Sequence, residues 1–133
     1  MAPLVAQMRV ALTVREFEAA VAFYRDGLGL SEEAIWTSHG QAVMLGAGMA
    51  TLEVFDERQA ASVDTIEVGE RVSGPVRLAF EVSDLDEALA RALAYGALLV
   101  HEPVVTPWGD RNARLQSPDG LQITLFQPSG EAG

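Results

Sequence analysis

Apolar and polar residues alternate along several short segments of this 133-residue chain, as they do in half-buried β-strands. The clearest segment, VRLAFEV at residues 76–82, places Arg77, Ala79 and Glu81 on one face and larger apolar side chains on the other. Directly after it, apolar residues recur every three or four positions, which is typical of an amphipathic helix. The pattern predicts a strand followed closely by a helix.

The same strand-and-helix pattern occurs earlier in the chain, where residues 9–14 align with residues 77–82. We expect the first helix at residues 16–26, with Gly27 and Gly29 ending it, and the second helix to end at Gly96. The expected buried stripes are Phe17, Ala20, Val21 and Tyr24 in the first helix, and Leu85, Ala88, Leu89 and Ala92 in the second. The chain therefore contains an internal repeat.

Each helix is followed by three short extended segments with turns between them. They are predicted at residues 34–38, 41–46 and 50–56 in the first half, and at 98–102, 112–116 and 121–127 in the second. His39-Gly40 and Ser117-Pro-Asp-Gly120 are the expected turns. The chain thus reads as one domain of two repeats, residues 7–56 and 75–127. Residues 57–74 are expected to be a linker with at most a short edge element.

A doubled strand-helix-three-strand unit resembles the vicinal oxygen chelate superfamily, which contains glyoxalase I, bleomycin-resistance proteins and extradiol dioxygenases. The resemblance rests on residues 14–30 (VREFEAAVAFYRDGLGL), 77–89 (RLAFEVSDLDEAL) and 117–126 (SPDGLQITLF). It implies an α+β fold in which two tandem βαβββ modules form a curled mixed sheet, shaped as a cup with the helices on the outside. It also implies a homodimer.

The resemblance further indicates where a metal would bind. Metalloenzymes of the superfamily take one ligand, usually histidine, from the first strand of each half, and another, usually glutamate, from the last. By position in the matching stretches, these places hold Arg9, Glu53, Arg77 and Thr124. Arginine offers only hydrogen-bond donors and stays charged, so Glu53 is the only plausible ligand. We therefore expect no metal site and no other cofactor.

Two interpretations of the arginines stay open. Arg9 and Arg77 could pair with Glu53 and Glu81 and fill the former metal position with ions, because a buried charge requires a partner. Alternatively, at least one of them contacts a ligand. The two interpretations are compatible, since a paired arginine still has N–H groups to donate.

The strand period also predicts the lining of a cavity. It places Thr124 and Phe126 on one face of the last strand and Glu53 and Phe55 on one face of the matching strand, although the phenylalanines could merely fill the cup. Trp108, in a Pro-Trp-Gly turn, is expected to be a wall or lid of the cavity. Trp36 is equally consistent with a wall and with the core. The expected ligand-binding residues are Arg9, Trp36, Glu53, Phe55, Arg77, Trp108, Thr124 and Phe126.

Charge and composition exclude several classes of function. The net charge of −10 argues against nucleic acid and anionic membranes as partners, and it is compatible with a cationic ligand or simply with solubility. There are no cysteines, no apolar run of about 20 residues that could span a bilayer and no signal-peptide pattern, so a cytoplasmic protein is expected. His39 is expected to be solvated. The neighbours His101 and Glu102 face opposite ways on a strand, which disfavours a shared role as general base.

Two functions follow from these patterns. The first is a metal-free protein that binds a small molecule in its cup, sequestering an antibiotic or a similar aromatic or cationic ligand. The second is an enzyme of the same fold, a lyase, isomerase or dioxygenase-like protein that acts on a small oxygenated metabolite, with an atypical metal site such as Glu53 with His101 or with no metal site. The missing histidine pair favours binding, and the sequence does not decide whether any catalysis occurs.

Overall fold

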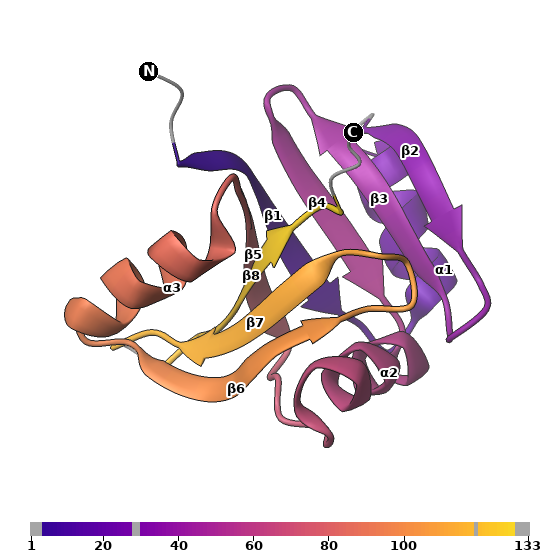
Figure 1. The fold of residues 1–133 in the computed structure, drawn as a ribbon. Helices are drawn as coiled ribbons and strands as arrows, with labels where there is room; N and C mark the ends of the chain where they lie inside the picture. Colours follow the sequence, from indigo (N-terminus) through magenta and orange to yellow (C-terminus); the bar gives the residue numbers. More distant parts are fainter. Residues whose placement is uncertain (1–3, 28–29, 119, 130–133) are drawn as a thin grey trace.

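The computed structural model describes residues 4–27, 30–118 and 120–129, and both repeats have the predicted order of elements (Figure 1). The first repeat consists of β1 (Val5–Thr13), α1 (Phe17–Val21) continued by the π-helix η1 (Ala22–Gly27), β2 (Ser31–Trp36), β3 (Ala42–Ala47) and β4 (Ala50–Phe55). The second consists of β5 (Val76–Val82), α3 (Leu85–Ala94), β6 (Leu98–Val105), β7 (Arg111–Gln116) and β8 (Gln122–Gln127). The two βαβββ modules are therefore confirmed.

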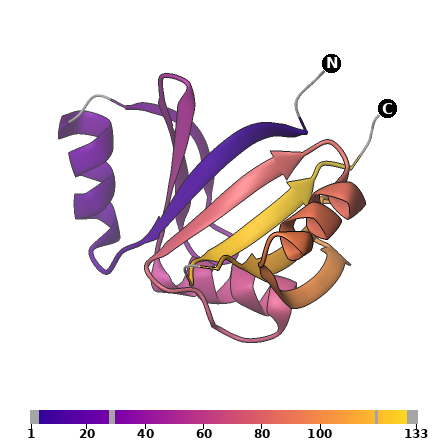
Figure 2. The same ribbon diagram turned by 90° about the vertical axis from the view of Figure 1, so that its left-hand side faces the viewer.

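All eight strands form one mixed sheet in the order β2-β3-β4-β1-β5-β8-β7-β6. The two halves join where β1 pairs antiparallel with β5. Within each half, the first strand pairs parallel with the last, β1 with β4 and β5 with β8. Figure 2 shows the sheet as strongly twisted, with the first strands of the two halves at its centre. The fold is the expected α+β fold.

Helices α1 and α3 cover one face of this sheet. Val21 of α1 packs with Val43 of β3 and Val54 of β4. Leu85 of α3, which is fully buried, packs with Leu125 of β8 and its neighbours. The predicted apolar stripes of both helices belong to these two clusters. Because side chains on a strand alternate, the residues next to these apolar ones point to the opposite face and are free to form a site.

The helix ends agree with the sequence in the described residues. Asp84 caps α3 by accepting a hydrogen bond of 3.1 Å from the Glu87 N–H. Gly96 follows the helix with a φ of 105°, a backbone conformation that favours glycine. Gly27 is the last residue of η1, as expected, whereas Gly29 lies outside the described residues.

The expectation of a linker at residues 57–74 was wrong, because these residues contain the helix α2 (Glu57–Val68). Asp56 caps it by accepting a hydrogen bond of 2.8 Å from the Gln59 N–H, and Gly69 ends it with a φ of 87°. The buried residues of α2 recur at helical spacing, but two of the four, Asp64 and Glu67, are acidic. A search for an apolar stripe therefore misses this helix. At 12 residues α2 is the longest of the described helices, and none of them is long and apolar enough to span a membrane.

The position of α2 also differs from the arrangement with all helices outside the cup. Ala60 and Val63 of α2 pack with Ala11 of β1 and Phe55 of β4, on the face opposite α1 and α3. The helix contacts β4 in one half and β6 and β7 in the other. It therefore closes one end of the cup from the inside.

The turn before β3 packs closely against the first turn of α2, and this contact can be tested at Gly40. A Cβ at Gly40 would lie 2.3 Å from the Gln59 backbone nitrogen, and the residue has a φ of 114°. We expect Gly40→Ala to lower the free energy of unfolding by about 3 kcal/mol, measured by urea denaturation, because strain and a backbone clash add.

Gly48→Ala is the matched control. Gly48 also has a positive φ, 66°, but a Cβ there would meet no atom within 4 Å. We expect a loss of only about 1 kcal/mol from the backbone conformation. Equal losses in the two variants would contradict the close approach of the turn to α2.

Candidate functional site

The floor of the cup is built from inward-facing residues of the central strands. In the register of the sheet, Ala11 of β1 lies between Glu53 of β4 and Arg77 of β5. In the next row Arg9 of β1 lies opposite Ala79 of β5. Each arginine therefore has an alanine beside it, which leaves space above the floor for its guanidinium group.

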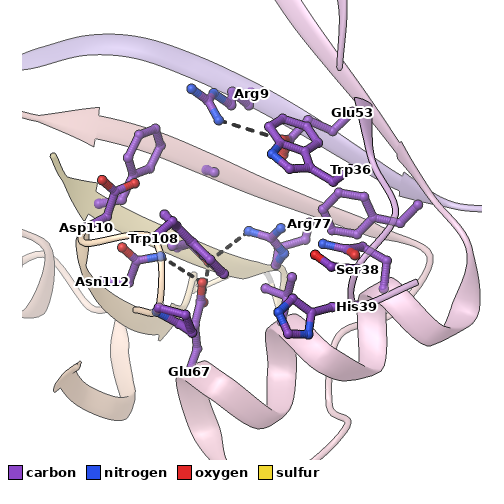
Figure 3. A pocket seen from close by; sticks show the side chains of 17 residues that line it. Arg9, Trp36, Ser38, His39, Glu53, Glu67, Arg77, Trp108, Asp110 and Asn112 are labelled. Carbon is purple, nitrogen blue, oxygen red and sulfur yellow. Dashed lines mark hydrogen bonds and ion pairs between the residues drawn. The ribbon is translucent and has the colours of Figure 1, made fainter. Parts of the chain in front are cut away.

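A cavity of about 530 Å³ lies above this floor, within the usual size range of small-molecule sites (Figure 3). The structure places all eight residues expected from the sequence on its lining: Arg9, Trp36, Glu53, Phe55, Arg77, Trp108, Thr124 and Phe126. Their convergence is an observation, whereas their contact with a ligand stays a prediction. The sequence analysis did not name Gln59, Glu67, Asp110 and Asn112, which also line the cavity.

Arg9 links the two halves of the floor. Its Nη1 lies 3.6 Å from Glu53 Oε2, and its guanidinium carbon lies 5.0 Å from the centre of the Phe126 ring. Its Nε donates to Gln7 Oε1 at 3.3 Å. The expected pairing of Arg9 with Glu53 is therefore present, and the cation also rests on an aromatic face.

Arg77 is 6% exposed and has few partners for a buried arginine. Its Nη1 donates to Thr124 Oγ1 at 2.8 Å, the only hydrogen bond of its guanidinium within the described residues. Its guanidinium carbon lies 5.7 Å from the centre of the Phe55 ring. Glu81 forms no ion pair with an arginine in the described part of the chain, because its place in the sheet is opposite Gln7 and Phe126.

Glu53 is a buried carboxyl whose pKa this environment changes. Burial raises its pKa above the usual range for glutamate, and the charge of nearby Glu67 raises it further. The charges of Arg77 and, less strongly, of Arg9 oppose that change. A carboxyl that faces a cavity and has a raised pKa is a candidate general acid or base.

Glu67 of α2 reaches the cavity from the side opposite Arg9. Its Oε1 accepts hydrogen bonds from Thr124 Oγ1 at 2.8 Å and from Arg114 Nε and Nη2 at 3.0 and 2.9 Å. Its Oε2 accepts from Asn112 Nδ2 at 2.9 Å. The carboxylate is thus held by four donor atoms from three residues, all on the neighbouring strands β7 and β8, and Figure 3 shows its hydrogen bond with Asn112.

Arg114 supplies the countercharge and is completely buried, at 0% exposed. Besides Glu67 it contacts Asp64 of α2, with 2.9 Å between Nη2 and Oδ1. Burial alone would raise the pKa of Asp64, but hydrogen bonds from the N–H and hydroxyl of Ser73 and the N–H of Val72, together with the charge of Arg114, lower it to about 2. Asp64 therefore remains ionised and anchors the end of α2 to β7.

The rim of the cavity is aromatic. Trp36 and Trp108 are 40% and 49% exposed and line the opening, so neither is a core residue. Of the two open interpretations of Trp36, core residue or cavity wall, the structure favours the cavity wall.

Asp110 also lines the cavity, beside Trp108. Burial raises the pKa of Asp110, while a hydrogen bond from the Trp108 side chain and the charge of Arg9 oppose that change.

Two buried side-chain oxygens at the cavity, Gln59 Oε1 and Asn112 Oδ1, accept no hydrogen bond from any described residue. The hydrogen bond to Glu67 determines which way the Asn112 amide is turned. A carboxylate only accepts hydrogen bonds, so Asn112 must face Glu67 with its NH₂ group.

Neither histidine has a central place in the site. His39 is exposed at the cavity rim, as expected. His101 is exposed on β6, where its Nδ1 lies 2.8 Å from the Glu102 carbonyl oxygen, and it does not line the cavity.

The residues at the family metal positions do not fit a divalent ion. Two of the four are arginines, and Thr124 has its hydroxyl committed to Glu67 and Arg77. No group of three or more His, Cys, Asp or Glu side chains with a geometry suited to a metal occurs among the described residues. The family positions therefore do not offer a divalent ion a complete set of ligands.

Sequence signals for the missed residues do exist. Asp56 and Gln59 have the spacing of a helix cap, and Gly69 stands where a helix ending at Val68 would need it. Arg114 lies between the apolar residues Ala113 and Leu115 of the strand at residues 111–116, and an arginine buried there requires acidic partners. The cap signals predict a helix at residues 57–68, whereas the pairing of Glu67 with Arg114 is seen only in the structure.

Comparison with known families agrees with this geometry. The family model described as Glyoxalase/Bleomycin resistance protein/Dioxygenase superfamily matches residues 7–125, which is most of the chain. The chain belongs to this superfamily. A search of curated proteins gave no match. The resemblance inferred from the repeat is confirmed.

Solved structures of the superfamily fold are similar to the chain at low sequence identity. A hypothetical protein from Bacillus halodurans C-125 matches with a TM-score of 0.69 and 18% identity over 98% of this chain and 99% of that one. Methylmalonyl-CoA epimerase from Mycobacterium tuberculosis matches with a TM-score of 0.68 and 21% identity over 98% and 93%. A superfamily member from Vibrio splendidus 12B01 gives 0.64 and 15% over 92% and 98%. These similarities establish the fold.

The donor chemistry at Arg9 and Arg77 gives a prediction about metal. We expect elemental analysis of the purified protein to find no stoichiometric Ni, Zn, Fe or Mn, because fixed positive charge opposes cation binding. Chelator treatment should leave the melting temperature unchanged. About one such ion per chain would contradict this prediction, and Glu53 would then be the first ligand to test.

The raised pKa of Glu53 gives a prediction about pH. The folded state binds this proton more tightly than the unfolded state, so the stabilisation is present below the unfolded pKa and is lost as pH rises through the folded pKa. Glu53→Gln removes this titration. The free energy of unfolding of the variant should therefore rise relative to that of the wild type by about 1.4 kcal/mol for each pH unit between the unfolded and the folded pKa of Glu53, measured by urea denaturation.

Arg77→Met provides the complementary test, because it removes the charge that lowers the pKa of Glu53 most strongly. The loss of stability should then continue to higher pH than in the wild type. Parallel pH profiles for the wild type and Glu53→Gln would show that Glu53 does not titrate in this way.

Proposed function

We propose that this protein binds a small, flat organic molecule in the cavity without a metal, and that it sequesters an antibiotic or a similar aromatic compound. The observation that carries the proposal is Arg77, a buried cation on the cavity floor with one hydrogen bond among the described residues. A buried guanidinium is stable only where its N–H groups find acceptors. An oxygen of a bound ligand supplies such an acceptor.

The aromatic side chains support a flat ligand. Trp36 and Trp108 stand at the rim, and Phe55 and Phe126 line the wall beside the arginines. Apolar walls with a few placed polar groups are typical of small-molecule sites. Exposed tryptophan is costly in water, and a stacked ligand would cover it.

Charge acts differently outside and inside the cavity. The net charge of −10 attracts a cationic molecule from a distance. Inside, the charge of Glu67 is offset by Arg114, and Glu53 faces two arginines. The best ligand therefore has an acceptor oxygen that reaches Arg77, and any cationic group is best placed at the rim near Asp110.

A thermal-shift screen against antibiotics and common metabolites, with and without divalent metals, tests this proposal. Hits are then titrated by tryptophan fluorescence, since Trp36 and Trp108 are the only tryptophans and both line the cavity. Aromatic ligands with an acceptor group should stabilise the protein equally with and without metal. Stabilisation only in the presence of metal would contradict the proposal.

The second candidate is a metal-free enzyme, and the raised pKa of Glu53 favours it. A carboxylate there could take a proton from carbon next to a carbonyl, while Arg77 stabilises the oxyanion that forms. Methylmalonyl-CoA epimerases share this fold, so the fold is compatible with catalysis. For any ligand with such a hydrogen, deuterium uptake in D₂O that disappears in Glu53→Gln would identify the enzyme.

Trp108 should contribute to binding and little to folding. We expect Trp108→Ala to weaken binding of the best screened ligand by about 1–3 kcal/mol, because it removes a stacking wall. Its melting temperature should stay close to that of the wild type, since the ring is about half exposed. Tyr95→Ala, which removes a highly exposed aromatic ring that does not line the cavity, is the control and should leave binding unchanged.

We expect a symmetric homodimer, with the cups completed near or across the interface. Both edge strands carry exposed apolar side chains, Ile35 on β2 and Leu98 and Val105 on β6, and exposed edges invite pairing. Light scattering at micromolar concentration should give twice the monomer mass of 14.2 kDa. A mass near that of the monomer would contradict this expectation.

A further inference from the structure

Thr124 stands between a carboxylate and a guanidinium, and its single hydroxyl proton can serve only one of them. Glu67 Oε1 lies 2.8 Å from Thr124 Oγ1, and Arg77 Nη1 lies 2.8 Å from the same oxygen. A carboxylate accepts and a guanidinium donates. The threonine must therefore give its proton to Glu67 and accept from Arg77.

Glu67 in turn is fixed from behind. Arg114 donates hydrogen bonds to Glu67 Oε1 from two nitrogens, and Asn112 donates to Glu67 Oε2. These partners are nearly or fully buried, and together they hold the carboxylate in place on the cavity lining. In the series Arg77–Thr124–Glu67–Arg114 every hydrogen bond therefore has a fixed donor: Arg77 donates to Thr124, Thr124 donates to Glu67, and Arg114 donates to Glu67 from the other side.

The Arg77 end of this series determines what the cavity offers a ligand. A guanidinium has five N–H groups in a rigid plane, and the bond to Thr124 fixes the position of one nitrogen. The Phe55 ring beside the guanidinium limits its tilt. Donors held in a plane match two oxygens in a plane, as in a carboxylate.

On the basis of the proposed function, we propose that Glu67 and Thr124 are positioning residues that orient Arg77 to bind the carboxylate of a small aromatic acid. Neither residue needs to touch the ligand. A purely structural role for the same bonds would change stability but would not change the choice between ligands. Ligand preference is therefore the quantity to measure.

The experiment compares two probes, 3-phenylpropionate and 3-phenylpropanol, which share the aromatic ring and differ in the group that would meet Arg77. Both are titrated against tryptophan fluorescence in the wild type, Thr124→Val and Thr124→Ser. Valine has the shape of threonine without the hydroxyl, and serine retains the hydroxyl. Glu67→Gln, which keeps the shape of the side chain and removes its charge, is the second variant.

The wild type should prefer the acid. Thr124→Val should reduce the ratio of the two dissociation constants about tenfold, the effect of losing one hydrogen bond to a charged group. Thr124→Ser should restore the ratio to within about twofold of the wild type, and Glu67→Gln should reduce it in the same direction as Thr124→Val. Circular dichroism establishes that each variant is folded.

The outcomes separate this inference from the proposed function. If both probes bind and Thr124→Val leaves the ratio unchanged, the positioning role is overturned and the binding function stands. If the wild type prefers the alcohol, the carboxylate class is overturned. If neither probe changes the fluorescence of the wild type, the proposed aromatic site fails and this inference fails with it.

Discussion

The structure depends on one buried charge. Arg114 is completely excluded from solvent on β7, and such a charge is tolerated only with partners. Both of its acidic partners, Asp64 and Glu67, come from α2, and they are three positions apart on one face of that helix. The ion pairs therefore set the position and rotation of α2 against β7, which the weakly apolar surface of the helix could not do alone.

The same constraint decides how the cavity works. Moving α2 away would leave Arg114 unpaired inside the protein, which typically costs about 3–5 kcal/mol. The helix is thus a fixed wall, and ligand entry is left to the rim formed by Trp36 and Trp108. Stability and recognition share residues here, because Glu67 neutralises Arg114 on one side and polarises Thr124 on the other.

The sequence predicted much of the fold because both repeats obey simple periods. Alternation along β5 and β8 placed Arg77 and Thr124 on the inward face, and helical spacing gave the outer stripes of α1 and α3. The helix α2 escaped because acidic residues occupy half of its buried stripe. Their burial is favourable only in the presence of Arg114, nearly fifty residues later in the chain, and single-sequence periodicity carries no information about such partners.

The exchange of metal ligands for arginines changes the kind of positive centre that the cup contains. A metal ion would accept lone pairs directly and could exchange its ligands, whereas a guanidinium only donates hydrogen bonds and keeps its place. Arg77 and Arg9 still present positive charge to the cavity, now stacked on Phe55 and Phe126. The cup can therefore attract and orient an oxygen without activating it as a Lewis acid. Glu53, whose pKa is raised by burial and which interacts with both of these cations, is the carboxyl on the cavity floor suited to proton exchange.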